Sequence, residues 1–543
     1  MAVDALEHSG AVPLLPAKLD ALAQVLISRR LYFAAKRIYD RAEALQDTLI
    51  GRADSVIVKT ALITGADQLY AHHFALLAEH FRDAEAAYDA VEQARGRAIT
   101  DLLLSKSAVS PQAVATERRI AKFRLQMASA KSPAEIARFR DAIFLEEQAR
   151  AVSPDLTILH TRHFRPVPLR KLQNALNSSE VVLEYVVAEP NSYVLVLSRD
   201  TRQILKLTGR KDIEKKVAEY TTAVKQGLSG KDEGRNLYEA LLAPIPLIQS
   251  KSHLLIIPDA CLNLVPFDAL VDEHGDFMVQ SHVVAYEPSS TTLYLLRSTE
   301  FVGKAEKGVL AVGGIPYSQT GSSGTNLQGP YGLDQKFQDL PNSAAEADIA
   351  VTELKNAPKK QLEGMAATES NLKDALREGY DYVHLAVHAV SSDDPDRASL
   401  IVLSDPSRGE DGVVQASEIV QMRLRTMLVV LSACDTDVGP IQGEEGLSAL
   451  STAFLLAGAK TVLSTLWPIE DRASLVLMRA FYQHLGAGQP VADALAAAKR
   501  DVLTKYGVNS SPIHWAGFVV QGSEPKPLAR GAGTLTAVSL RAR

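Results

Sequence analysis

The chain has 543 residues, of which 46% are hydrophobic and 22% are charged, and its formal net charge is −6. A chain of this length can bury several hydrophobic cores, and a usual domain size of about 150 residues suggests roughly three or four domains. The composition is that of an ordinary globular protein without the basic excess of nucleic-acid-binding proteins, so nucleic acid is not indicated as a partner.

Cysteine usage and hydropathy indicate the compartment. Only two cysteines occur, Cys261 and Cys434. This argues against a disulfide framework or a cysteine-ligated zinc site and suits a reducing environment. The first 20 residues lack the basic and apolar regions of a signal peptide, and no run of about 18 apolar residues occurs. We therefore expect a cytoplasmic protein without a membrane span.

Residues 1–105 are predicted to be degenerate helical repeats of the tetratricopeptide kind. Ala, Leu and Tyr recur at spacings of three and four, which is typical of packed helices. An aromatic-x2-Ala-x3-Tyr pattern occurs twice, at Tyr32, Ala35 and Tyr39 and again at Phe81, Ala84 and Tyr88. Helix pairs of this kind stack into a concave surface, which we expect to bind a regulatory or sensor protein. Plain helical packing without a partner is the alternative.

Residues 106–152 are helical and charged, and the break at Ser132-Pro133 predicts a helical hairpin that acts as a spacer. From 153 to 300 the pattern changes to α/β. Short connections between apolar runs at 181–188, 193–198 and 203–207 predict an antiparallel meander. A helix over 210–228 follows, then the apolar stretch 253–270. Cys261 lies in that stretch, and a packed thiol is its expected role.

The region 301–522 alternates strands with helices, which predicts a mostly parallel sheet covered by helices on both faces. The glycines in the strand-like run 308–316 are not followed by a nucleotide-binding pattern, so no nucleotide site is expected. The polar segment 317–340 is predicted to be a mobile surface loop, and 523–543 a disordered tail. The remaining strands are expected at 381–389, 399–404, 427–434, 461–465 and 515–522, and the helices near 343–355, 368–378, 446–457 and 471–504.

Two of these strands end at potentially reactive side chains. DYVHLAVHA ends near His388, and MLVVLSACDT runs into Cys434. Both residues are therefore expected at the carboxyl edge of one parallel sheet, where open α/β folds build their sites. A nearby imidazole promotes ionisation of a thiol and can protonate a leaving amine. For the developing oxyanion we nominate the backbone N–H groups of Ala389 and Cys434.

Further polar residues lie near these strand ends. His384 lies four positions before His388, a strand spacing that places both residues on one face. It is the weaker catalytic candidate because it lies inside the strand. The acidic residues after the cysteine can pair with a basic substrate side chain or be solvated loop charges; they are Asp435, Asp437, Glu444 and Glu445.

The motifs HLAVHA, SLIVLSD, LVVLSACDTDVG, GEEGLSALSTAFLLAGAKTVLSTLWPIED and HWAGFVVQG occur in this order. With upstream motifs such as LLIIPDACLNLVPFDAL, the stretch from about 160 to 522 resembles the CHAT peptidase-like family, a branch of the caspase, separase and gingipain group. The resemblance implies a caspase-like α/β fold at 301–522, preceded by a pseudo-protease-like part at 153–300. It also implies a His388/Cys434 catalytic dyad, cleavage of a protein substrate, and no metal or cofactor. Tetratricopeptide repeats often precede such domains, and related members often act in bacterial signalling or defence.

One residue departs from the family pattern. The family usually has glycine after the catalytic histidine, whereas this chain has Ala389, whose methyl group could narrow an oxyanion pocket. We expect a cysteine endopeptidase that is latent until a partner reshapes the segments 317–340 and 435–446. Two other functions remain open: a catalytically silent scaffold that binds partners through its helical repeats, and a cysteine-dependent acyl transferase or hydrolase.

Overall fold

The computed structural model describes residues 14–52, 66–95, parts of 119–127, 130, 132–151, 165–298, 308–318, 337–354, 358–390, 398–432, 446–507 and 511–523. The predicted nucleophile and its acidic neighbours lie outside these ranges; they are Cys434, Asp435, Asp437, Glu444 and Glu445. The tail after 523 also lies outside them. No helix within the described ranges is long and apolar enough to cross a lipid bilayer.

The N-terminal region is helical, as predicted. Its elements are α2 (Leu15–Ser28), α3 (Tyr32–Arg52), α5 (Asp67–Leu76), a π-helical turn (Leu77–Phe81) and α6 (Ala84–Ala94). Ala35, Tyr39 and Tyr88 of the repeated motif are fully buried between helices. The ring of Tyr32 stacks on His80 with centroids 3.8 Å apart. The repeated motif therefore marks helix–helix contacts.

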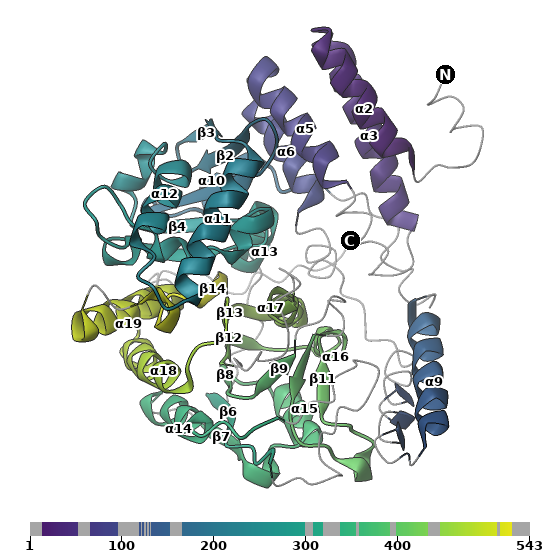
Figure 1. Cartoon of the computed structure of the whole chain (residues 1–543), viewed down its shortest axis with the longest axis vertical. Helices are drawn as coiled ribbons and strands as arrows, with labels where there is room; N and C mark the ends of the chain where they lie inside the picture. The colour runs from purple at the N-terminus through teal and green to yellow at the C-terminus, as the bar shows by residue number, and fades with distance from the viewer. Residues whose placement is uncertain are drawn as a thin grey trace, which may run out of the picture.

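Helices α5 and α6 are built into the α/β region. Phe74, Leu77 and Val91 share a hydrophobic core with Val186 and with Leu293. Polar contacts join the same parts of the chain, since the hydroxyl of Tyr193 donates to Glu79 at 2.7 Å and that of Tyr88 donates to the carbonyl of Val167 at 2.9 Å. Helices α2 and α3 pack on α5 and lie at the end of the molecule (Figure 1). The helical region is therefore continuous with the core of the α/β region.

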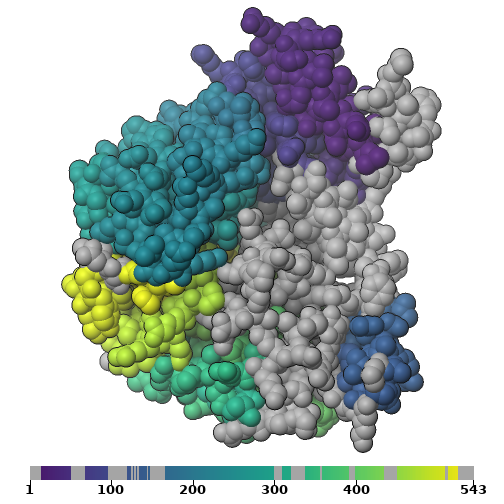
Figure 2. All heavy atoms as spheres, in the orientation of Figure 1, coloured from purple at the N-terminus to yellow at the C-terminus, as the bar shows by residue number. Residues whose placement is uncertain are grey.

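The predicted spacer contains α9 (Pro133–Ala151), which begins at the Ser-Pro break. The side chain of Ser132 accepts the N–H of Glu135 at 3.2 Å and so caps this helix. Ile143 of α9 packs against Ile120 and Met127, as a helical hairpin requires. Figure 2 shows α9, in blue, at the lower right of the molecule, away from the purple helices α2 and α3.

Eleven strands form one sheet in the order β3-β2-β1-β4-β5-β14-β13-β12-β8-β6-β7. Pairing is antiparallel at β1–β2, β2–β3 and β13–β14 and parallel elsewhere, so the predicted meander and the mostly parallel sheet are confirmed. The last strand, β14, pairs with β5 and joins the two halves of the α/β region in one sheet. The strands are β1 (Glu180–Val186), β2 (Ser192–Leu197), β3 (Arg202–Leu207), β4 (His253–Ile257), β5 (Val283–Tyr286), β6 (Val309–Gly313), β7 (Lys359–Glu363), β8 (Tyr382–Leu385), β12 (Thr426–Leu431), β13 (Ala459–Thr465) and β14 (Phe518–Gly522).

Helices cover both faces of this sheet. The central strands present apolar side chains on both faces, so both faces have to be shielded from water. Leu428 and Val430 of β12 belong to one core, and Val429 and Leu431 belong to the other. The first face carries α11 (Arg210–Lys225), α12 (Lys231–Leu241), α14 (Ser343–Glu353), α18 (Asp471–Gly486) and α19 (Val491–Tyr506). The second face carries α10 (Leu169–Ala175), α13 (Ser290–Ser298), α15 (Glu369–Glu378), α16 (Ala416–Val420) and α17 (Gly446–Ala457), together with α5 and α6 (Figure 1). The predicted fold class is confirmed.

The structure corrects two strand predictions. The run 381–389 is not one strand: β8 ends at Leu385, and β9 (His388–Val390) belongs to a second sheet. That sheet is antiparallel with the order β11-β10-β9, and it takes in β10 (Ser399–Ile401) and β11 (Val413–Gln415). The segment 399–404, expected in the main sheet, is therefore outside it. The prediction that His384 and His388 share one strand face is also wrong, because the chain changes sheets between them.

Candidate active site

The strand that precedes His388, β8, and the strand that precedes Cys434, β12, are parallel neighbours in the main sheet, whereas His388 itself begins β9 of the second sheet. Leu385, the last residue of β8, pairs with Leu431, the last residue of β12. The N–H of Ser432 then donates to the carbonyl of Leu385 at 3.1 Å, which holds the two strand ends together. His388 follows its paired residue by three positions. Cys434 does the same on the other strand, although the structure does not describe it.

The imidazole of His388 is oriented by a backbone carbonyl. The side chain is fully buried, and its Nε2 lies 2.7 Å from the carbonyl oxygen of Gln338. Because a carbonyl oxygen only accepts hydrogen bonds, Nε2 must carry a proton. The basic nitrogen of the neutral ring is then Nδ1. His388 is thus held in the tautomer that can take a proton at Nδ1.

Two aromatic rings pack against this imidazole. The centroid of Tyr317 lies 4.7 Å from that of His388, and the centroid of Phe337 lies 5.0 Å from it. The Tyr317 hydroxyl accepts the N–H of His388 at 3.2 Å and donates to the carbonyl of Ile401 at 2.8 Å. Burial raises the pKa of Tyr317, so the phenol stays protonated and can donate. The rings and the hydroxyl together fix the start of β9.

These contacts come from the two ends of the segment predicted to be a mobile loop. The N–H and the hydroxyl of Ser318 donate to the two oxygens of Asp339, at 2.8 and 2.7 Å. This bridge closes the base of the segment next to Gln338. Its interior, 319–336, lies outside the described residues. The ends of the segment are therefore part of the site.

Ala389 lies in β9 opposite Leu400, with an extended backbone outside the left-handed region. Glycine is therefore not required at this position for a positive φ. The Tyr317 hydroxyl lies between His388 and its paired residue Ile401, so the His388 N–H points toward β10. Successive N–H groups of a strand point in opposite directions, so the Ala389 N–H points away from β10.

His384 has different surroundings on the other side of the main sheet. Its Nδ1 lies 2.9 Å from the hydroxyl of Tyr482, and its Nε2 lies 3.5 Å from Oε1 of Glu346. Burial lowers the pKa of His384 to about 3, so the imidazole is neutral. This buried, neutral ring fits the structural role that the sequence favoured for His384.

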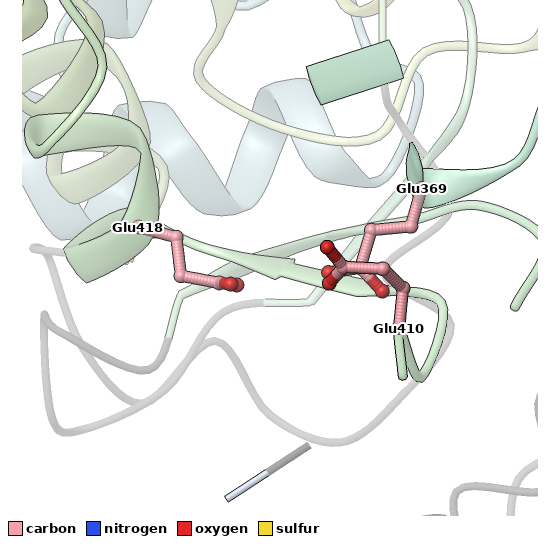
Figure 3. A group of neighbouring side chains, drawn as sticks. All are labelled: Glu369, Glu410 and Glu418. Atoms are coloured by element: carbon pink, nitrogen blue, oxygen red, sulfur yellow. The ribbon is translucent and has the colours of Figure 1, made fainter. Parts of the chain in front are cut away.

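A cluster of carboxylates is the one group in the described part of the chain whose geometry could suit a metal ion. Carboxylate oxygens of Glu369, Glu410 and Glu418 lie within 4.8 Å of one another. Figure 3 shows the first two meeting, with Glu418 pointing toward them from α16. However, Nζ of Lys373 lies 2.6, 2.8 and 2.7 Å from these three carboxylates. The ammonium supplies the positive charge that a metal would bring, so the group is a buried ion cluster.

The ionisation of this cluster is uneven. Burial and the neighbouring carboxylates raise the pKa of Glu369 well above its usual range. Burial acts in the same direction on Glu410, but the ammonium of Lys373 outweighs it and lowers the pKa of that residue. Backbone N–H groups of Gly412 and Gln415 donate to Glu369 and Glu418 at 2.6 and 2.9 Å. The carboxyl groups of the cluster are therefore paired with the Lys373 ammonium and with backbone N–H groups of the protein.

Sequence reasoning missed three residues of the site. Gln338 acts through its backbone carbonyl, which leaves no mark in the sequence. Tyr317 and Phe337 are aromatic residues at the two ends of a polar, Gly/Ser-rich segment, and that contrast was a usable signal. The other cysteine, Cys261, is buried in the core of the sheet's first face, in agreement with the packed thiol predicted for it.

The α/β sheet and the buried His388 agree with the motifs noted in the sequence. A comparison with known protein families then identifies the class of protein. Residues 231–523, more than half of the chain, match the CHAT domain family. The chain therefore belongs to the CHAT domain family, and the resemblance noted in the sequence is confirmed.

Two curated relatives, both named for tetratricopeptide repeats, match parts of this chain. The human protein "Tetratricopeptide repeat protein 28" is 27% identical over 338 residues, which cover 54% of this chain and 13% of the human protein. The mouse protein of the same name is 35% identical over 131 residues, which cover 24% of this chain and 5% of the mouse protein. The chain thus spans only a small part of the length of these relatives.

Two kinds of solved structure are similar. The separase–securin complex of Saccharomyces cerevisiae matches with a TM-score of 0.47 and 10% identity, covering 92% of this chain and 38% of that chain. The Arg-specific cysteine proteinase gingipain R matches with a TM-score of 0.34 and 11% identity, covering 59% of this chain and 70% of that chain.

Proposed function

We propose that this protein is a cysteine endopeptidase in which Cys434 is the nucleophile and His388 the acid and base. The observation that supports this most is the pairing of the two strand ends that precede these residues, together with the Gln338 contact that leaves Nδ1 as the basic nitrogen of His388. Cys434 follows Ser432 by two residues, so its Cα lies at most about 7 Å from that of Ser432. This short connection to Ser432 supports a nucleophile at position 434.

In this mechanism Nδ1 of His388 takes the proton of the Cys434 thiol, and the thiolate attacks the peptide carbonyl. The N–H groups of Ala389 and Cys434 donate to the oxyanion; the Ala389 N–H points off the edge strand of its sheet. The imidazolium then protonates the departing amine as the C–N bond breaks. A water molecule, deprotonated by His388, hydrolyses the thioester and regenerates the thiol.

Specificity and regulation follow from charges and exposed surfaces. Asp435, Asp437, Glu444 and Glu445 would pair with a basic side chain at the cleaved position.

The helical region would recruit a regulator or substrate, because large apolar side chains are exposed there: Val25, Leu31 and Phe33, the last 79% exposed. A partner would reshape the segments 317–340 and 435–446 and relieve latency. A cytoplasmic location and a role in signalling or defence in bacteria belong to the same proposal.

Alkylation of the two cysteines tests the proposed dyad without a known substrate. Iodoacetamide is applied between pH 5.5 and 9, and the peptides containing Cys434 and Cys261 are quantified by mass spectrometry. We expect Cys434 to be alkylated faster than Cys261. We also expect its alkylation rate to rise at a lower pH than that of an ordinary thiol of pKa about 8.5. His388→Ala should remove this advantage, and the buried Cys261 serves as the internal control. Equal Cys434 profiles in wild type and His388→Ala would refute the dyad.

A catalytically silent scaffold is the second candidate, and the exposed apolar side chains of α2 and α3 favour it. Proteomics of new N-termini in cells, comparing wild type with Cys434→Ala, separates the two functions. New termini that depend on Cys434 support the peptidase. Unchanged termini, with normal cellular function in the His388→Ala/Cys434→Ala variant, support the scaffold.

A further inference from the structure

The main sheet ends in an open edge at β7. Strand β7 is the last in the strand order, and within the described part of the chain it pairs only with β6. Figure 1 shows β7 at the lower end of the sheet and β3 at the upper end. The side chains at the two ends of β7, Lys359 and Glu363, are exposed. Such an edge strand presents unpaired backbone groups to which another strand can add.

The pairing with β6 shows which backbone groups of β7 point outward. The N–H of Val309 donates to the carbonyl of Pro358 at 2.9 Å, so Pro358 directs its carbonyl inward to β6. The direction alternates along a strand, so Lys360 and Leu362 also direct their backbone groups to β6. The N–H and C=O groups that point outward therefore belong to the other residues of β7: Lys359, Gln361 and Glu363.

We propose that β7 pairs antiparallel with β7 of a second copy of this chain, around a two-fold axis at Gln361. In that register Gln361 lies opposite its own copy, and Lys359 lies opposite Glu363 of the second copy. These residues direct their backbone groups outward, so they can form the hydrogen-bonded pairs of an antiparallel ladder. The axis repeats the Lys359–Glu363 pair on its other side, as an isologous interface requires. The inference goes beyond the proposed function and does not depend on it.

The charges of β7 favour a second copy as the partner. Lys359 and Glu363 lie four positions apart, so their side chains are on the same face of the strand. Opposite charges on directly opposed residues stabilise an antiparallel pair. Among the described residues, the Lys359 side chain forms no ion pair, and the Glu363 carboxylate accepts only the amide of Gln361, at 3.4 Å. Both charges can therefore pair with those of a second copy.

The opposite edge of the sheet, β3, carries charges that prevent self-pairing. Its charged residues, Arg202 and Lys206, are both basic. In the equivalent register, centred on Ile204, they would oppose each other with like charge, which destabilises a ladder. Lysines commonly protect edge strands in this way. On β7 that protection is absent in one register, because Glu363 lies where Lys359 of a second copy would arrive.

The contact is short, so the dimer is expected to be weak. Two strands of five residues bury much less surface than the about 1,200–2,000 Å² of a stable interface. We therefore expect a monomer–dimer equilibrium that depends on concentration. Strands β6, β7 and β8 are mutually parallel, and antiparallel pairing reverses their direction in the second copy. The carboxyl ends of the two β8 strands, which precede the His388 residues, would therefore lie at opposite edges of the joined sheet.

Charge reversal tests the register. Lys359→Glu and Glu363→Lys each place like charges opposite each other at both ends of the ladder. Each variant alone should therefore dimerise more weakly, with a Kd raised on the order of tenfold. An equimolar mixture of the two variants restores opposite charges in the mixed dimer, so dimerisation should approach the wild-type level. Sedimentation velocity between about 1 and 100 µM measures wild type, each variant and the mixture.

Two further variants separate this register from a general effect of charge. Lys360→Glu makes the same charge change on the same strand, but the side chain of Lys360 lies on the other face, opposite the apolar Leu362 of the second copy. It is the matched control and should leave the dimer unchanged. Gln361→Pro removes an N–H that points outward and leaves the ladder with β6 intact, so it should abolish dimerisation.

The inference is supported if both single reversals weaken a wild-type dimer and their mixture restores it. It is overturned if wild type sediments as a monomer throughout the range, if either reversal has no effect, or if the mixture stays monomeric. It is also overturned if Lys360→Glu weakens the dimer as much as Lys359→Glu, or if Gln361→Pro retains it. Tryptophan fluorescence checks that each variant is folded. The alkylation of Cys434 is a separate measurement, so failure of the dimer leaves the proposed dyad unaffected.

Discussion

Replacement of Lys373 by methionine tests whether the buried ion cluster depends on one ammonium group. Nζ of Lys373 contacts Glu369, Glu410 and Glu418 at 2.6 to 2.8 Å, and its side chain is 8% exposed. Methionine retains much of the apolar stem but has no charge. Removing one partner of a buried ion pair destabilises a protein by about 3–5 kcal/mol, because the remaining charge has no counterion. We expect a loss of that size from a total stability of about 5–15 kcal/mol.

The loss should depend on pH. Without the ammonium, the carboxyl of Glu410 loses the charge that lowers its pKa, so burial raises that pKa above its value in the unfolded chain. A carboxyl with a raised pKa binds more protons in the folded state, so the stability of the variant falls as pH rises through that value. Lys373→Met should therefore be closer to wild type at pH 5 than at pH 8.

Urea unfolding followed by tryptophan fluorescence measures this effect in the relevant region. The two tryptophans of the chain, Trp467 and Trp515, are both buried in the α/β region, so their emission reports its unfolding. Lys360→Met is the matched control. Lys360 pairs with Glu378 at 2.9 Å on the surface, and exposed pairs contribute about 0–1 kcal/mol. Equal midpoints for the two variants at pH 8 would refute the reasoning.

Three further predictions concern single contacts. Tyr317→Phe leaves the buried N–H of His388 without its acceptor and should reduce stability by about 1–3 kcal/mol in the same urea assay; an unchanged midpoint would contradict the contact. The carboxylate of Glu92 accepts two N–H groups at the start of α13, at 2.9 and 2.7 Å, so Glu92→Ala should speed hydrogen exchange in the first turn of that helix and nowhere else on the second face. The hydrogen bond to Asp493 raises the pKa of His253, so its contribution to stability is complete below about pH 6.5 and is lost as pH rises through the raised value. His253→Gln should therefore be less stable than wild type at pH 5.5 and equal to it at pH 9, and a difference that persists at pH 9 would argue against this linkage.

Local patterns in the sequence were sufficient for the order of most helices and strands, although not for the sheet to which His388 belongs. Continuous apolar runs predicted strands such as β12, whose alternate side chains enter opposite cores. Glycine, proline and polar runs marked where these elements end. The abrupt end of two apolar runs before His388 and Cys434 also predicted that β8 and β12 lie in the same parallel sheet. Such features are carried by consecutive residues, so one sequence is enough to detect them.

Only the tertiary structure decided which groups surround the histidine. The carbonyl of Gln338, 50 positions away, orients His388, and the continuous run 381–389 divides between two sheets. Glu346 and His384 face each other only because α14 packs across β8. Hydrophobic periodicity predicts which face of an element is buried, but it does not specify the opposing element or the register between them. Contacts that depend on backbone carbonyls and long-range packing therefore had to come from the fold.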